Sequence, residues 1–269
     1  MADLHATFDI QDSVGVLTLN RPDRLNAISN QMLSEIRSYL DICEDPDGGV
    51  RCLLITGSGR GFCSGADLAG GGLPSGGDKD AMKKLDVGLT LERDYNPIIQ
   101  RLASLRVPVV TAVNGGAAGA GCSFAIAGDI AIAAKSAYFL QAFVNIGLVP
   151  DAGSSFFLPR RIGEARAAAM MMLGEKIPAE TAQDWGLVYE VVDDEALMER
   201  AMAVAVKLAN GPTRAISLIR EMANTSLSND MSTQLQMERK YQKIAGRSPE
   251  FREGVAAFLE KRKADFTKV

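Results

Sequence analysis

Short apolar runs alternate with helix-patterned segments along the first two hundred residues. Val14–Leu19 and Cys52–Thr56 are apolar runs that predict buried strands, and Gln31–Cys43 between them carries apolar residues at helical spacing. The run 107–113 predicts a third strand, and a fourth is predicted to begin at Asp129. Strands that alternate with helices in this way predict an α/β core.

The segments between these strands predict a loop and two helices. Residues 70–79 are rich in glycine and proline, which prevent a packed element, so we expect a mobile loop that lies over part of a site. Leu91–Leu105 predicts a charged helix, and we expect its residues 92–95 on a solvated face rather than in a pocket. The small-residue run 116–128 predicts a tight turn that enters a helix.

The pattern changes near Ala201, after which only helical periodicity is found. Gly211-Pro212 and the polar stretch 226–232 divide this part into separate helices. We therefore expect a core over residues 1–200 and a C-terminal helical region over residues 201–269 that serves in assembly.

Composition and charge narrow the classes of partner. Of 269 residues, 47% are hydrophobic and 23% charged, which is typical of a globular protein. The net charge of -4 argues against a nucleic-acid partner. The N-terminus has acidic residues where a presequence would have basic ones, and no apolar run is long enough for a membrane span, so we expect a cytoplasmic protein without a membrane partner.

Cysteine and histidine limit the chemistry further. The four cysteines are scattered singly, without the spacing of a metal site, and are expected to be reduced and buried: Cys43, Cys52, Cys63 and Cys122. The single histidine, His5, is expected in a frayed terminal segment, so a mechanism that needs a histidine base is hard to build.

Two glycine-rich turns are the strongest candidates for chemistry. Residues 57–68 and 114–124 each follow a predicted strand, and the second opens a helix. Small residues let a ligand approach backbone N–H groups, and a helix N-terminus favours negative charge, so the turns could hold an oxyanion. Close packing alone is the alternative. A dinucleotide site is disfavoured because Phe124 replaces the third glycine of its motif.

Beyond these patterns, five segments in the same order and spacing resemble the crotonase (enoyl-CoA hydratase/isomerase) superfamily over nearly the whole chain. They are LNRPDRLNAIS, ITGSGRGFCSGADL, VPVVTAVNGGAAGAGCSFAIAGDIAIAA, FVNIGLVPDAGSSFFLPRRIG and EGVAAFLEKRKADF. The resemblance implies an α/β crotonase-like spiral of ββα units with a C-terminal helical oligomerisation region. It also implies a homotrimer or a dimer of trimers, an acyl-CoA substrate, and no metal, flavin or nicotinamide, with coenzyme A entering as part of the substrate.

The same resemblance implies roles for particular residues. The backbone N–H groups of Ala66 and Ala120 would hold the thioester oxygen. Lys261 would lie near the 3'-phosphate of coenzyme A, contributed by a neighbouring subunit, although a solvated helix end is an equally open interpretation. The remaining substrate or coenzyme A contacts would come from Arg24, Leu25, Ser64, Ala66, Asp67, Leu68 and Phe143.

The likeness also bears on the reaction. Hydratases of the family hold water between two glutamates, and this chain has Ser123 and Phe143 at those positions, so hydration is doubtful. Asp151 stands where the family's isomerases and its dehalogenase carry a catalytic aspartate. The likeness is greatest to isomerases that act on ring-epoxidised phenylacetyl-CoA, with departures at Ala66 and Ser154.

We expect Asp151 to be the single acid/base residue, with a pKa raised by the apolar side chains of Phe139, Phe143, Leu148 and Phe156. Its alternative role is to cap the helix that follows or to serve as a turn residue after Pro150. Asp67 and Asp129 are expected to form structural hydrogen bonds. A dehalogenase also needs a histidine and a tryptophan, for which His5 and Trp185 are badly placed, and a non-catalytic coenzyme A-binding scaffold would not need Asp151.

Overall fold

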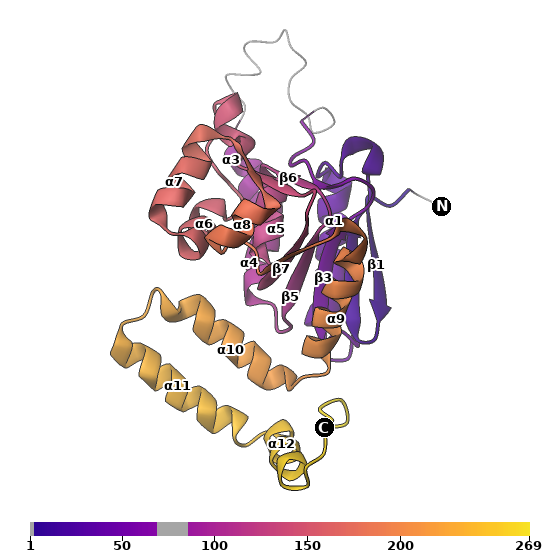
Figure 1. The fold of residues 1–269 in the computed structure, drawn as a ribbon, viewed down its shortest axis with the longest axis vertical. Helices are drawn as coiled ribbons and strands as arrows, with labels where there is room; N and C mark the ends of the chain where they lie inside the picture. The colour runs from indigo at the N-terminus through magenta and orange to yellow at the C-terminus, as the bar shows by residue number, and fades with distance from the viewer. Residues whose placement is uncertain (1–2, 69–85) are drawn as a thin grey trace.

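The computed structural model describes residues 3–68 and 86–269, and the loop predicted over 70–79 lies outside the described residues. Two sheets form the core (Figure 1). The larger sheet has the strand order β1 (Ala6–Gln11), β2 (Val14–Leu19), β3 (Cys52–Gly57), β5 (Val109–Val113), β7 (Ile130–Ala134), β10 (Glu190–Val192). The smaller has the order β4 (Gly61–Cys63), β6 (Gly116–Ala118), β8 (Tyr138–Leu140), β9 (Lys176–Pro178).

The chain passes between the two sheets in a regular way. β3, β5 and β7 lie in the larger sheet, and the strands that follow them, β4, β6 and β8, lie side by side in the smaller one. Pairing is parallel throughout these strands. Helices follow each pair, which confirms the predicted spiral of ββα units in an α/β fold. The predicted strands of the larger sheet are confirmed as well.

Helices pack on the sheets through apolar faces. α1 begins with a side-chain cap, since Ser29 Oγ accepts a hydrogen bond from the Met32 N–H at 3.1 Å, and it buries Met32, Leu33, Ile36, Leu40 and Cys43. α5 is buried along its whole length. The helices of the core are α1 (Asn30–Glu44), α3 (Val87–Thr90), α4 (Asn96–Ser104), α5 (Ala120–Ala127), α6 (Ser154–Ile162), α7 (Glu164–Leu173), α8 (Ala179–Trp185) and α9 (Leu197–Ala209).

Two core segments differ from the sequence prediction. The helix predicted over Leu91–Leu105 consists of two pieces, the π-helical turn η2 (Leu91–Tyr95) and α4, and η2 joins α4 to the preceding α3. Proline cannot donate a backbone hydrogen bond, and Pro97 stands at the start of α4, where the Asn96 N–H reaches back to Leu91 O. The run 116–128 forms the short strand β6 before it enters α5.

His5 lies in an ordered segment, contrary to the prediction. The segment is held in place because His5 Nδ1 lies 2.6 Å from Ser29 Oγ and the His5 carbonyl accepts a hydrogen bond from the Asn20 N–H at 2.7 Å.

The four cysteines are buried free thiols, as expected. Burial raises the pKa of Cys43, Cys63 and Cys122 to about 12.

The C-terminal helices α10 (Thr213–Ser226), α11 (Met231–Ala245) and α12 (Pro249–Leu259) stand apart from the core in Figure 1. α9 instead packs on β3 and β5 and buries Ala201, Val204, Ala205 and Ala209. The boundary predicted at residue 200 therefore falls inside a core helix, and the change in packing comes after Ala209. In the described part of the chain, no helix has the length and apolar character needed to cross a membrane.

Candidate active site

The two glycine-rich turns lie against one another at the ends of β4 and β6, which are neighbouring parallel strands. Ala66 follows β4, where it forms a single bridge with Ile28, and Ala120 is the first residue of α5. Within the described residues, neither the Ala66 nor the Ala120 backbone N–H has a hydrogen-bond acceptor. Two free donors at the edge of one sheet can serve a ligand oxygen.

Glycine is required where the turns touch. Gly65 has a φ of +97°, and a β-carbon there would lie 2.9 Å from Ala118 O and 3.5 Å from the Ala120 nitrogen. A β-carbon at Gly121 would lie 2.2 Å from Cys63 O. Because a side chain at either position would force the backbones apart, these glycines keep the two donor residues close together.

A buried asparagine shapes the segment before the first turn. Asn26 has a φ of +55°, and its Nδ2 donates to Gly61 O at 2.8 Å and to Ser58 O at 2.9 Å. The Arg21 N–H donates to Asn26 Oδ1 at 2.8 Å. These bonds hold the segment of Arg24 and Leu25 beside the first turn.

The structure brings together six of the residues predicted to contact coenzyme A, beside the first glycine-rich turn. The Ser64 N–H donates to Leu25 O at 2.9 Å and its hydroxyl to Arg24 O at 3.3 Å. Asp67 forms an ion pair with Arg21 at 2.8 Å, which fits the expected structural role. The six are Arg24, Leu25, Ser64, Ala66, Asp67 and Leu68.

Lys261 is not part of this group within one chain. It follows α12, which Figure 1 places at the opposite end of the molecule from α3 and β6. It is exposed, and it has a φ of +53° where the helix ends. Its predicted phosphate contact would need a second chain.

Asp151 is a half-buried residue whose carboxylate has no ion-pair partner among the described residues. Its Oδ1 is buried and has no hydrogen-bond partner in the described structure. Burial raises the pKa of Asp151 to about 6, which confirms the direction that we expected. The capping alternative is wrong, because Gly153 is the residue that precedes α6 and the cap has no side-chain hydrogen bond.

Only some of the four predicted apolar neighbours face this region. Phe139 and Phe143 are buried, and the Phe143 ring lies 3.9 Å from where a β-carbon of Gly119 would stand, beside the second turn. Phe156 is 47% exposed and stacks under the Arg160 guanidinium at 3.6 Å. The expectation that Phe156 surrounds Asp151 is therefore wrong, because its place on α6 turns it to the surface.

Tyr95 is a residue whose place the sequence prediction missed. Tyr95 and Asp94 are buried instead of solvated, while Arg93 is exposed and pairs with Asp94 at 2.8 Å. Burial raises the pKa of Tyr95, and the nearby charge of Asp151 raises it further. The signal was present, since Tyr95, Ile98, Ile99 and Leu102 follow the spacing of one buried helix face.

A chain of buried polar side chains runs behind Asp151. Gln141 Nε2 donates to Ser154 Oγ at 3.1 Å, and Ser154 Oγ lies 2.5 Å from Ser123 Oγ. Ser123 Oγ in turn donates to the backbone carbonyl of Asp151 at 3.0 Å. All three side chains are 0% exposed. Ser123, where a hydratase would have a glutamate, thus contacts the backbone of the aspartate.

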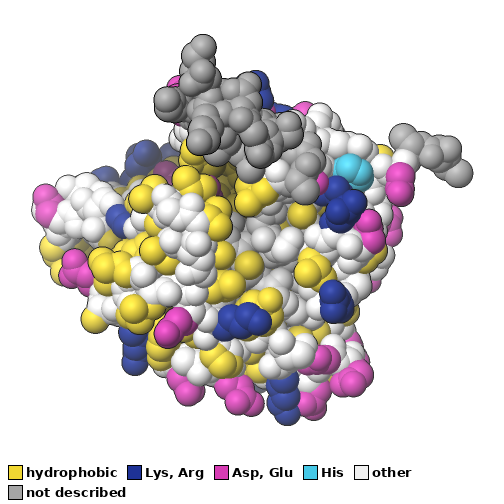
Figure 2. Space-filling view, turned by 90° about the horizontal axis from the view of Figure 1, so that it is seen from above, with side chains coloured by type: hydrophobic (Ala, Val, Ile, Leu, Met, Phe, Trp, Pro, Cys, Tyr) yellow, Lys and Arg dark blue, Asp and Glu magenta, His cyan; other side chains and the backbone are white. Residues whose placement is uncertain are grey.

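The surface near the site is apolar. Figure 2 looks onto the end of the molecule that carries α3 and β6, and hydrophobic side chains gather over its middle. Exposed apolar side chains at α3 and in the segment before Asp151 include Leu89, Val144, Ile146 and Val149. In residues 3–68 and 86–269, no group of three or more His, Cys, Asp or Glu side chains could hold a metal ion.

Comparison with known proteins gives consistent matches over the whole chain. The family model for enoyl-CoA hydratase/isomerase matches residues 9–269. A protein of Escherichia coli (strain K12) named 1,2-epoxyphenylacetyl-CoA isomerase is 46% identical over 258 residues, which is 96% of each chain. The probable enoyl-CoA hydratase of Rhodobacter capsulatus is 42% identical over 260 residues, 97% of this chain and 96% of the relative. The crystal structure of an enoyl-CoA hydratase from Bacillus anthracis superposes with a TM-score of 0.88 at 30% identity, over 97% of this chain and 98% of the other.

Proposed function

The chain belongs to the enoyl-CoA hydratase/isomerase family, and from that membership we propose that it is an acyl-CoA isomerase with a single acid/base residue, Asp151. The observation that carries the proposal is the Asp151 side chain, whose Oδ1 is buried without a hydrogen-bond partner in the described structure and whose pKa is raised by burial. The two family glutamate positions hold Ser123 and Phe143, neither of which is acidic.

The proposed reaction moves one proton between two carbons of the acyl group. The ionised Asp151 carboxylate takes a proton from the carbon next to the thioester, and the electron pair of that C–H bond passes to the thioester oxygen as an enolate. The protonated Asp151 then returns the proton to a carbon further along the conjugated system, and the electrons leave the oxygen. Substrate and product have the same composition, so no co-reactant is needed.

Ala66 and Ala120 support the proposal because their N–H groups are neighbouring and have no acceptor among the described residues. Both would donate to the thioester oxygen as it gains negative charge, at a place where the backbone is already fixed by the glycine contacts. Loss of one such donor typically costs about a hundredfold to a thousandfold in rate. Coenzyme A would enter as part of the substrate, with Arg24, Leu25, Ser64, Asp67 and Leu68 along its path, and no other cofactor or metal would take part.

For the acyl group, we propose an arylacetyl or 3-enoyl chain. The name of the Escherichia coli relative describes an isomerase of an epoxidised phenylacetyl-CoA, which carries hydrogens between the thioester and the ring. Phe143 beside the second turn and the exposed apolar side chains near α3 suit such a hydrocarbon group.

We also propose that chains assemble as a trimer, or as a dimer of trimers, through the C-terminal helices. A cavity of about 750 Å³ lies between α10 and the core. α12 exposes an apolar stripe of Phe251, Val255, Phe258 and Leu259, the last two at 82% and 73%. Assembly would also bring Lys261 of one chain toward the coenzyme A of another. The buried free thiols fit the reducing cytoplasm, which we propose as the location.

Hydration is the second candidate, and the relative named as a hydratase at 42% identity favours it. It would need another acid to hold the water, because Ser123 is neutral and bonded to Asp151 O and Phe143 is apolar. The candidate acid would then be Tyr95, a buried phenol whose pKa is raised by burial and by the charge of Asp151.

Turnover by wild-type protein and Asp151→Asn tests the proposal. We expect the wild type to isomerise a 3-enoyl-CoA or ring-epoxidised phenylacetyl-CoA, and the variant to lose about a hundredfold to ten-thousandfold in kcat. Asp9→Asn, which changes an exposed carboxylate on β1, is the matched control and should keep full activity. Strong hydration of a 2-enoyl-CoA by the wild type, or isomerisation that survives in Asp151→Asn, would contradict the proposal.

A further inference from the structure

The buried chain of Gln141, Ser154 and Ser123 has a defined direction. Each serine hydroxyl has one proton to donate. Ser123 Oγ donates its proton to Asp151 O, so the proton between the two serine oxygens is that of Ser154, whose Oγ accepts from Gln141 Nε2. The chain therefore ends on the backbone of the residue whose carboxylate is proposed to move the proton.

Ser123 also contacts the peptide group that presents the second oxyanion donor. The Ser123 N–H donates to Gly119 O at 3.2 Å, and Ser123 Oγ lies 3.4 Å from the same oxygen. This carbonyl belongs to the planar trans peptide that carries the Ala120 N–H, so the two groups point in opposite directions. Ser123 holds the carbonyl inside the helix, and the N–H is thereby directed outward.

We propose that Ser123 is a positioning residue: by bonding Asp151 O and the Gly119–Ala120 peptide together, it fixes the carboxylate relative to the oxyanion donor. The inference rests on the proposed isomerase function. It assigns a role to the position at which a hydratase has a water-holding acid. Here the side chain acts on the backbone of the aspartate, and with Ser154 Oγ at 2.5 Å and no exposed surface, the position has no room for a longer side chain.

Ser123→Ala tests the assignment in the full-length protein. A misplacement of about 1 Å can cost on the order of a hundredfold in rate, so we expect kcat to fall about tenfold to a hundredfold while KM stays within about twofold. The acid limb of the pH–kcat/KM profile, which reports the free enzyme, should move to lower pH than in the wild type, because burial raises the pKa of Asp151 and a released Asp151 becomes better solvated. A role in folding alone would move neither the limb nor kcat of the folded enzyme.

Thr111→Val is the matched control. Thr111 is also buried, and its hydroxyl donates to Ala125 O of α5 at 2.7 Å, but it has no contact with Asp151 in the described structure. This variant should lose stability as Ser123→Ala does and keep the wild-type kcat and pH limb. Ser154→Ala breaks the chain one step further away, so it should give a smaller loss in kcat, and it serves if Ser123→Ala does not fold.

The outcomes separate the inference from the proposed function. If Asp151→Asn is inactive but Ser123→Ala and Ser154→Ala have the wild-type kcat and pH limb, the positioning role is overturned and the isomerase stands. If Asp151→Asn remains active, the isomerase proposal fails first. An equal fall of kcat in Thr111→Val would also overturn the assignment, since any lost buried hydroxyl would then have the same effect.

Discussion

Asp151 carries an ionisable group in a place that disfavours its charge, and this affects stability as well as proton transfer. Its folded-state pKa is about 6 against an ordinary value of 3.8. Between these values the folded chain binds more protons than the unfolded chain, so stability falls as pH rises from about 4 to about 6. At neutral pH the wild type therefore keeps an ionised carboxylate at a cost in stability.

Asp151→Asn should accordingly stabilise the fold while it abolishes turnover. The neutral amide avoids the cost of burying the charge, so the free energy of unfolding at pH 8 should rise, by about 1–3 kcal/mol. The gain should shrink below pH 6 and vanish below pH 4, where both side chains are neutral. Urea unfolding at pH 4, 6 and 8 measures this, and a variant that is destabilised at pH 8 would show that the carboxylate has an unrecognised stabilising partner.

At the scale of single residues, the sequence predicted the types of group better than their contacts. The apolar composition around Asp151 was enough to predict a raised pKa. The hydrogen bond from Ser123 to Asp151 O could not be predicted, because it joins residues 28 positions apart through a fold whose details pattern does not determine. The position of Phe156 was predicted wrongly because Phe156 and Phe157 are adjacent on α6, and the sequence does not indicate which of the two faces the core.

At the scale of elements, α10 is joined to the core by one buried cation. Arg220 is 8% exposed, its Nε lies 2.6 Å from Asp129 Oδ2, and its Nη atoms donate to the carbonyls of Leu102 and Leu105. Asp129 also accepts from the Val109 N–H at 2.7 Å, at the start of β5. One side chain thus connects the helix that begins the C-terminal region with the end of α4 and the central strands.

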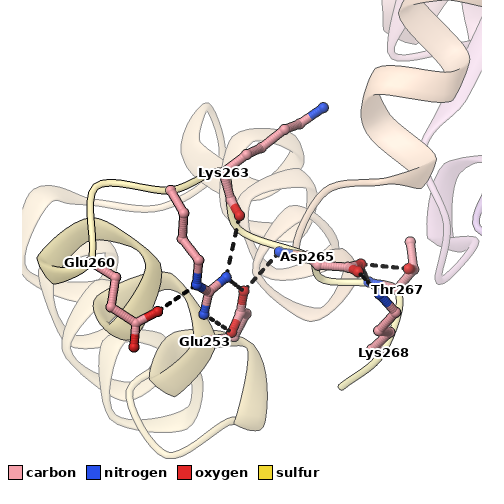
Figure 3. A network of polar contacts seen from close by, with 7 residues as sticks. Glu253, Glu260, Lys263, Asp265, Thr267 and Lys268 are labelled. Carbon is pink, nitrogen blue, oxygen red and sulfur yellow. Dashed lines mark hydrogen bonds and ion pairs between the residues drawn. The ribbon is translucent and has the colours of Figure 1, made fainter.

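Arg220→Ala should therefore lower the free energy of unfolding by about 1–3 kcal/mol, because it leaves the carbonyls of Leu102 and Leu105 without their donor. Denaturant unfolding of the variant measures the loss. Arg262→Ala is a useful control, since Arg262 forms a similar paired contact with Glu253 at 2.6 Å but in an exposed network near the C-terminus (Figure 3). It should change stability little. Similar losses in both variants would contradict the importance of burial.

Elements themselves were well predicted where periodicity was strong. Val14–Leu19 and the C-terminal helices appear as expected, because strand and helix patterns of that length have few alternatives. β4, β6, β8 and β9 are three residues long, too short to produce a period, and the sequence prediction did not find them. They nevertheless form the sheet that positions both glycine-rich turns.

At the scale of the whole molecule, the apolar stripe on α12 predicts association. The segment after α12 is held by the exposed network of Figure 3, in which Asp265 pairs with Lys268 at 2.7 Å. This network leaves Phe258 82% exposed. A face of this kind in a chain that works in water is expected to be covered by another chain.

Phe258→Glu should therefore reduce the assembly to smaller species, since it places a charge in an apolar contact. Light scattering coupled to size-exclusion chromatography measures the mass, and Lys263→Glu, which adds an acidic group beyond the helix, is the control and should leave the mass unchanged. A wild-type protein that is already a single chain at micromolar concentration would refute the assembly. Activity lost together with mass would support a contribution of Lys261 across chains.

The pairing of β4 with β6 has a consequence for the geometry of catalysis. Neighbouring strands lie about 4.8 Å apart, so the chains that leave them begin at that separation. An oxygen that accepts two N–H groups at about 2.9 Å, from directions about 110° apart, needs nitrogens about 4.8 Å from each other. The ordinary spacing of strands in a β-sheet therefore equals the distance between two backbone nitrogens that donate to one oxygen atom. A fold that places a free N–H at the end of each of two adjacent strands has a receptor for one oxygen atom before any side chain is chosen, and side chains are then free to vary with the substrate.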